Sequence, residues 1–129
     1  GSGSLGIEAL SNGAKKCYFV DNNKIAIEKI KKNTLGITNK EIIQNDCFKA
    51  LLELKKIKFD IILLDPPYHD NLLNKVLEKI DEYDLLNENG IVVCELEEEI
   101  LNTNLKLIKE KKYGNKQVKI FAKNKVNKM

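Results

Sequence analysis

The sequence lacks any apolar run long enough to cross a lipid bilayer, and its first residues lack the basic region and apolar stretch of a secretory signal. We therefore expect a cytoplasmic protein with no membrane contact. Cysteine is also scarce, with Cys17, Cys47 and Cys94 far apart in the chain. An odd number without a close pair argues against a disulfide framework and against a clustered zinc site. We expect reduced thiols and no bound metal.

The sequence also lacks internal repeats and linkers. Its 129 residues, of which 43% are hydrophobic, fit one domain over residues 1–129. The net charge of +3 is unevenly distributed, because residues 95–99 are acidic and residues 106–128 are strongly basic. Such a basic segment is often only a solvated surface, but it could also meet a polyanion such as RNA, with Lys116 and Lys119 as candidate contacts.

Apolar runs alternate with amphipathic stretches, a pattern typical of a mostly parallel sheet covered by helices. We expect parallel strands at KCYFVD, EIIQ, FDIILLD and GIVVCEL, with helices between them. FDIILLD is the most hydrophobic segment, which predicts a central strand buried on both faces. Residues 105–124 predict two strands joined at Tyr113-Gly114-Asn115, an antiparallel hairpin that closes the sheet.

Gly1, Gly3 and Gly6 directly precede or enter the predicted helix LGIEAL, as the glycines of a nucleotide-binding loop do. A cloning scar at the front is disfavoured, because the sequence continues at once into this helix. In an open parallel sheet, ligands bind beyond the carboxyl ends of the strands, where glycine lets the backbone approach closely. A strand should precede such a loop, so we expect an amino-terminally incomplete domain whose first strand is missing.

Asp21 ends the predicted strand KCYFVD, near the spacing at which an acidic residue meets ribose hydroxyls. The alternative is an aspartate that caps the helix starting near Asn23. NAD and S-adenosylmethionine fit this pattern equally well, since both carry an adenosine ribose.

The stretch Asp65-Pro66-Pro67-Tyr68 follows the most apolar strand and so falls in the same expected crevice. The prolines fix the backbone and remove two amide donors. The Asp65 carboxylate and the Pro66 carbonyl can accept the two hydrogens of an exocyclic amine, while Tyr68 stacks on the extruded base. This arrangement predicts amine methylation. The alternative is a purely structural role, in which the motif is a rigid turn and the tyrosine has no function.

Together, GSGSLGIEALSNGA, YFVDNN, NDCF, LLDPPY and YGNKQVKIF resemble the RsmD family of bacterial methyltransferases over nearly the whole chain. The resemblance implies a Rossmann-like fold that uses S-adenosylmethionine to methylate a guanine N2 amine in 16S ribosomal RNA. It also implies a monomer whose partner is ribosomal RNA or the assembling small subunit.

The resemblance further assigns roles to individual residues. Asp21 would hold the ribose, Asp46 would reach the adenine amine, and Cys47 would supply a backbone contact. Asn22 would also belong to the cofactor site. The cofactor loop would hold Gly1, Gly3 and Gly6, and the target-base site would be formed by Asp65, Pro66, Pro67 and Tyr68.

Three other functions stay open. An adenine-N6 DNA methyltransferase shares the chemistry of the proline motif, although no segment of this chain looks like a separate target-recognition region. A nucleotide-binding oxidoreductase is disfavoured, because nothing downstream resembles a hydride-transfer site. A fragment that keeps the fold without the activity is the third.

Overall fold

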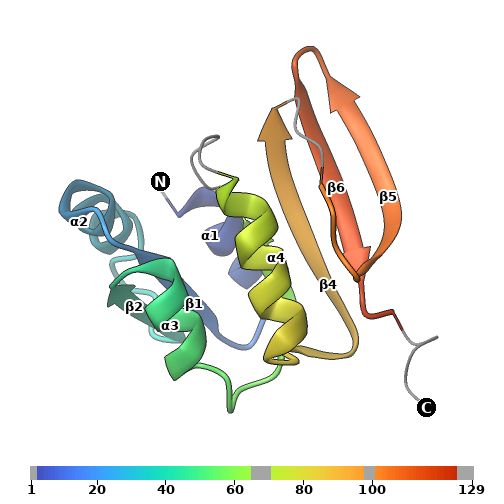
Figure 1. Cartoon of the computed structure of the whole chain (residues 1–129). Helices are drawn as coiled ribbons and strands as arrows, with labels where there is room; N and C mark the ends of the chain where they lie inside the picture. The colour runs from blue at the N-terminus through green and yellow to red at the C-terminus, as the bar shows by residue number, and fades with distance from the viewer. Residues whose placement is uncertain (1–2, 65–70, 98–100, 125–129) are drawn as a thin grey trace. The chain divides into compact units, whose positions relative to one another are not determined.

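The computed structural model describes residues 3–64, 71–97 and 101–124. The chain forms two compact α/β units, residues 1–50 and 51–129 (Figure 1). A single domain over residues 1–129 remains a prediction. No helix in the described ranges is long and apolar enough to span a membrane.

The first unit alternates helices and strands. Its elements are α1 (Ser4–Ser11), β1 (Cys17–Asp21), α2 (Lys24–Asn33), β2 (Lys40–Gln44) and the start of α3 (Cys47–Glu53). Strands β1 and β2 pair in parallel, with Cys17 opposite Lys40 and Asp21 opposite Gln44. Ile27 and Ile30, one helical turn apart on α2, are buried together with Phe19 of β1. The parallel pairing predicted from the sequence is confirmed here.

The second unit holds a four-stranded sheet and one long helix. Its elements are β3 (Phe59–Leu64), α4 (Leu72–Glu82), β4 (Leu86–Glu97), β5 (Lys106–Tyr113) and β6 (Lys116–Ala122). The strand order is β3-β4-β6-β5, with β3 parallel to β4 and β6 antiparallel to both of its neighbours. Gly114 takes a φ of 61° between β5 and β6, so the predicted hairpin and its turn are confirmed.

The core of this unit lies on one face of its sheet. Alternate residues of β4 are fully buried, and Phe121 of β6, opposite Val92, is buried on the same face. The buried side chains of α4 supply the other half of the core, because this helix runs beside β4 (Figure 1). The buried apolar residues of this core are Leu73, Val76, Leu77, Ile80, Leu85, Leu86, Val92, Cys94, Leu96, Leu105 and Phe121.

The predicted burial of β3 on both faces is wrong. None of its residues is fully buried, and Ile61 leaves 48% of its surface exposed. The reason is that β3 forms an edge of its sheet, pairing only with β4 among the described residues. In the described part of the chain no strand precedes α1, which begins directly after Gly3.

Candidate functional site

The start of α1 offers unoccupied backbone donors. Gly3 is the N-cap residue, its φ of 81° lies in the left-handed region, and no side chain of the described residues caps the helix. The first turn carries no acidic residue either. Because the first N–H groups of a helix have no partner within it and the helix dipole favours negative charge, this end can receive an anionic group.

Gly6 serves the packing of α1 against β1. A Cβ atom at this position would lie 2.5 Å from Phe19 Cε1 and 2.8 Å from Cys17 Sγ. At Gly3, one turn earlier, a Cβ atom would approach Phe19 and Ile30 instead, at 3.2 and 3.3 Å. The helix therefore runs with its amino end toward the carboxyl end of β1. Both glycines fit a cofactor loop, Gly6 through close helix-strand packing.

Asp21, the last residue of β1, holds the turn into α2. Its Oδ1 accepts the Asn23 backbone N–H at 2.9 Å, and Oδ2 makes no hydrogen bond among the described residues. Asn22 is exposed beside it. The helix cap is Asn23 itself, whose Oδ1 accepts the N–H groups of Ile25 and Ala26 at 2.8 and 3.1 Å. The alternative in which Asp21 caps α2 is therefore wrong.

Asp46 and Cys47 stand at the equivalent point after β2. Oδ1 of Asp46 accepts the N–H groups of Phe48 at 2.9 Å and Lys49 at 3.2 Å at the start of α3. The carboxylate is exposed, and its Oδ2 makes no hydrogen bond within the described residues. Burial, followed by the negative charges of Asp46 and Asp21, raises the pKa of the Cys47 thiol to about 11.

The two strand ends lie side by side. The Asn45 backbone N–H donates to the Asp21 carbonyl at 3.0 Å, continuing the β1–β2 ladder beyond Gln44. At the carboxyl ends of β1 and β2, toward which the amino end of α1 points, there are thus two carboxylates. Each has one oxygen that makes no hydrogen bond among the described residues. A ribose diol and an adenine amine, both hydrogen-bond donors, match these acceptors. The described residues contain no group of three or more histidine, cysteine or acidic side chains that could hold a metal.

The predicted target-base residues Asp65, Pro66, Pro67 and Tyr68 lie outside the described residues, as does Gly1. Their flanks are described. Leu64 ends β3 opposite Cys94 of β4, and Asn71, with a φ of 56°, is the N-cap residue directly before α4.

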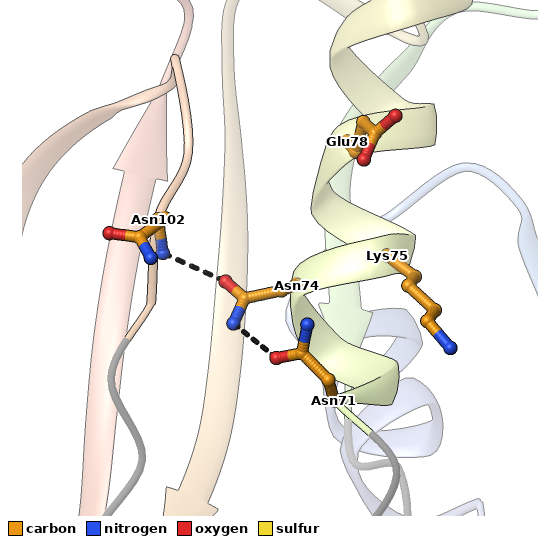
Figure 2. A pocket seen from close by; sticks show the side chains of 5 residues that line it. All are labelled: Asn71, Asn74, Lys75, Glu78 and Asn102. Carbon is orange, nitrogen blue, oxygen red and sulfur yellow. Dashed lines mark hydrogen bonds between the residues drawn. The ribbon is translucent and has the colours of Figure 1, made fainter.

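A polar pocket that sequence reasoning missed lies at the start of α4. The Asn102 backbone N–H donates to Asn74 Oδ1 at 2.8 Å, and Asn74 Nδ2 donates to Asn71 Oδ1 at 2.6 Å (Figure 2). Lys75 and Glu78 complete the lining. Asn74 thereby connects Asn71, which lies three residues after Tyr68 in the sequence, to the segment that precedes β5. The spacing of Asn71 and Asn74 on a predicted helix was the available signal, but Asn102 is distant in sequence.

Comparison with known proteins identifies the family. The family model described as Conserved hypothetical protein 95 matches residues 1–122. This chain belongs to that family. It is 39% identical over 132 residues to the Bacillus subtilis protein named "Putative rRNA methyltransferase YlbH", covering 95% of this chain and 72% of that protein. It is 36% identical over 122 residues to Ribosomal RNA small subunit methyltransferase D of Haemophilus influenzae, covering 88% of this chain and 63% of that enzyme.

A solved structure agrees with these relatives. A Haemophilus influenzae protein described as a "putative methylase" superposes with a TM-score of 0.79 at 34% identity, covering 94% of this chain and 73% of that one. The resemblance to the RsmD family and the Rossmann-like methyltransferase fold are confirmed. The chain spans 63% to 72% of the length of the two curated relatives.

Proposed function

We propose that this chain is the catalytic part of an S-adenosylmethionine-dependent methyltransferase that acts on the N2 amine of a guanine in 16S ribosomal RNA. The observation that carries the proposal is the meeting of Asp21 and Asp46 at adjacent strand ends, with an uncapped helix start directed to the same edge. The names of the relatives supply the RNA substrate.

The cofactor fits this edge by chemistry. Asp21 would accept the ribose hydroxyls, with exposed Asn22 beside it, and Asp46 would accept the adenine amine hydrogens. The backbone at Gly3 and the first turn of α1 would receive the methionine carboxylate. S-adenosylmethionine supplies an electrophilic methyl group when bound. Oδ1 of each aspartate already holds a turn, so the carboxylates are oriented before any ligand arrives.

The target base is assigned to the proline motif. Asp65 and the Pro66 carbonyl would accept the two amine hydrogens, Pro67 would keep the loop rigid, and Tyr68 would stack on the base. Holding both hydrogens directs the nitrogen lone pair at the methyl group, so catalysis rests on orientation and electrostatics. The complete enzyme is proposed to work as a monomer in the cytoplasm, on ribosomal RNA or the assembling small subunit.

Two measurements on the same variant test this function. Asp65→Ala should abolish incorporation of tritiated methyl groups into ribosomal RNA while leaving S-adenosylmethionine affinity, measured by calorimetry, nearly unchanged. Asp21→Ala is the matched variant on the cofactor side, and it should weaken cofactor binding by roughly 1 to 3 kcal/mol, the scale of hydrogen bonds to a charged group. Near-normal turnover of Asp65→Ala would refute amine methylation at this motif.

Substrate choice separates the alternatives. Methyl transfer to adenine in DNA but not to ribosomal RNA would favour an adenine-N6 DNA methyltransferase. Tighter binding of NAD than of S-adenosylmethionine would favour the oxidoreductase.

A further inference from the structure

The β5–β6 hairpin is the most basic part of the described chain. Residues 106–122 contain six lysines and one glutamate. Every residue of β5 is exposed, and β5 is the outermost strand of its sheet. A strand of this kind presents its side chains to a partner on either face. The register of the hairpin determines which lysines lie on the same face of the sheet.

The lysines divide between two faces. Lys109, Lys111 and Tyr113 are two positions apart along β5, so their side chains lie on the same face of the sheet. Lys116 lies on this face too, because it pairs directly with Tyr113. Lys112 lies on the opposite face, because it neighbours Lys111 and Tyr113 along the strand. Lys119 is on that opposite face too, since it pairs with Cys94, a buried residue of the core face. Lys116 and Lys119, both candidate RNA contacts in the sequence analysis, thus lie on opposite faces of the sheet.

Tyr113 gives the first face an aromatic surface. Tyr113 is 55% exposed, and Lys111 Nζ lies 5.1 Å from the centroid of its ring. Lys116 lies opposite Tyr113 in the hairpin register, and its Nζ is 3.7 Å from Glu95 Oε1. Lysines that flank an exposed ring combine phosphate attraction with base stacking, the two components of single-strand recognition.

Part of this face lies near the carboxyl end of β3, from which the proline motif follows in the sequence. Leu64, the residue before the proline motif, pairs with Cys94, whereas Lys116 pairs with Glu97 three residues further along β4. The hairpin tip therefore projects roughly 10 Å beyond the end of β3 and lies roughly 10 to 15 Å across the sheet from it. Figure 1 shows the tip at the same end of this unit as the start of α4.

We propose that the face formed by Lys109, Lys111, Tyr113 and Lys116, the tyrosine face, binds single-stranded RNA flanking the target guanine. The inference rests on the proposed function, because that function supplies the substrate class. Phosphates contact the three lysines, and one base stacks on Tyr113 while Lys111 stays at the ring. The opposite face of the hairpin takes no part.

Two double variants of equal charge test the face. Lys109→Ala/Lys111→Ala removes two charges from the tyrosine face, and Lys112→Ala/Lys119→Ala removes two from the other face. Affinity for a short single-stranded RNA with a central guanine is measured over a series of salt concentrations. The slope of log affinity against log salt should fall by about 1.4 for the first variant, at about 0.7 per lost phosphate contact, and change little for the second.

Single changes at Tyr113 test the stacking. Tyr113→Ala should weaken RNA binding by about 5-fold to 150-fold, while Tyr113→Phe should bind as the parent does. Circular dichroism establishes that each variant is folded, and calorimetry with S-adenosylmethionine establishes that the first unit is intact.

The outcomes keep the two hypotheses apart. Absence of methyl transfer to RNA by the complete enzyme would refute the proposed function. Methyl transfer by the complete enzyme together with equal salt slopes for both double variants would overturn the tyrosine face. A loss confined to binding of anionic lipid vesicles, with RNA binding unchanged, would overturn it as well and identify a membrane contact instead.

Discussion

Asp84 lies between α4 and β4 with a φ of 52° and two lysine partners. Its Oδ2 is 2.8 Å from Lys58 Nζ, and its Oδ1 is 3.0 Å from Lys123 Nζ. Hydrogen bonds from Lys58 and then Lys123 lower the pKa of the Asp84 carboxyl from 3.8 to about 2. All three side chains are within reach of solvent, so screening keeps the stabilisation small.

The change Asp84→Asn isolates this charge, because asparagine tolerates a left-handed backbone. A carboxyl whose folded-state pKa is depressed stabilises the protein above the unfolded-state pKa near 4, and the stabilisation is lost as pH falls through about 2. In urea titrations at a series of pH values, the parent should be more stable than Asp84→Asn above about pH 4. The two should converge near pH 2, and a pH-independent difference would contradict the ion pairs.

Gly6 tests the packing of α1. Within a helix, Gly→Ala ordinarily stabilises by up to about 1 kcal/mol. Here the added methyl would lie 2.5 Å from the Phe19 ring, so we expect Gly6→Ala to lower the free energy of unfolding by about 1 to 3 kcal/mol. Combining it with Phe19→Leu should recover part of the loss. Strictly additive effects in this double-mutant cycle would show that the contact does not exist.

At the scale of the element, α2 depends on its first residue. Asn23 caps the helix through two backbone N–H groups, while its own N–H is held by Asp21. Asn23→Ala should lower the free energy of unfolding by about 1 kcal/mol, whereas Asn23→Ser should keep most of the stability that the cap supplies, because serine can also accept these hydrogen bonds. Thermal unfolding measures both. Equal losses in the two variants would mean that side-chain capping is not what stabilises α2.

How far the sequence predicts these elements depends on the range of the interaction. The hairpin turn and the buried stripe of α2 were predictable, because Gly114 and the spacing of Ile27 and Ile30 act within a few residues. Burial of β3 was predicted wrongly, since an apolar run does not reveal how many strands flank it. The meeting of Asp21 and Asp46 followed from parallel strand order, but the link from Asn74 to Asn102 spans 28 positions and leaves no local pattern.

At the scale of the whole molecule, the described strands form two sheets with open edges. β1 pairs only with β2, and β3 pairs only with β4, among the described residues. Unpaired strand edges with apolar side chains promote association between chains. We expect residues 1–129, produced alone, to self-associate with rising concentration in light-scattering measurements.

A charge on the β3 edge should oppose this association. Ile61→Lys places one there, on a residue that is 48% exposed, and should reduce scattering. Leu35→Lys is the matched control, because Leu35 is 79% exposed and lies outside any strand. A monomeric, cooperatively unfolding parent protein would contradict the open edges.

The environment of Cys47 has a consequence for chemical labelling. With its pKa raised to about 11, the thiol is almost wholly un-ionised at neutral pH, and alkylating reagents react only with thiolate. Iodoacetamide should therefore modify Cys47 roughly 100-fold more slowly than an ordinary cysteine. Asp21→Asn removes one of the charges that raise this pKa and should accelerate the reaction, as followed by mass spectrometry. The alkylation rate of one sulfur atom thus reports both its burial and the negative charge at the ends of β1 and β2, and the comparison with Asp21→Asn separates the part due to Asp21.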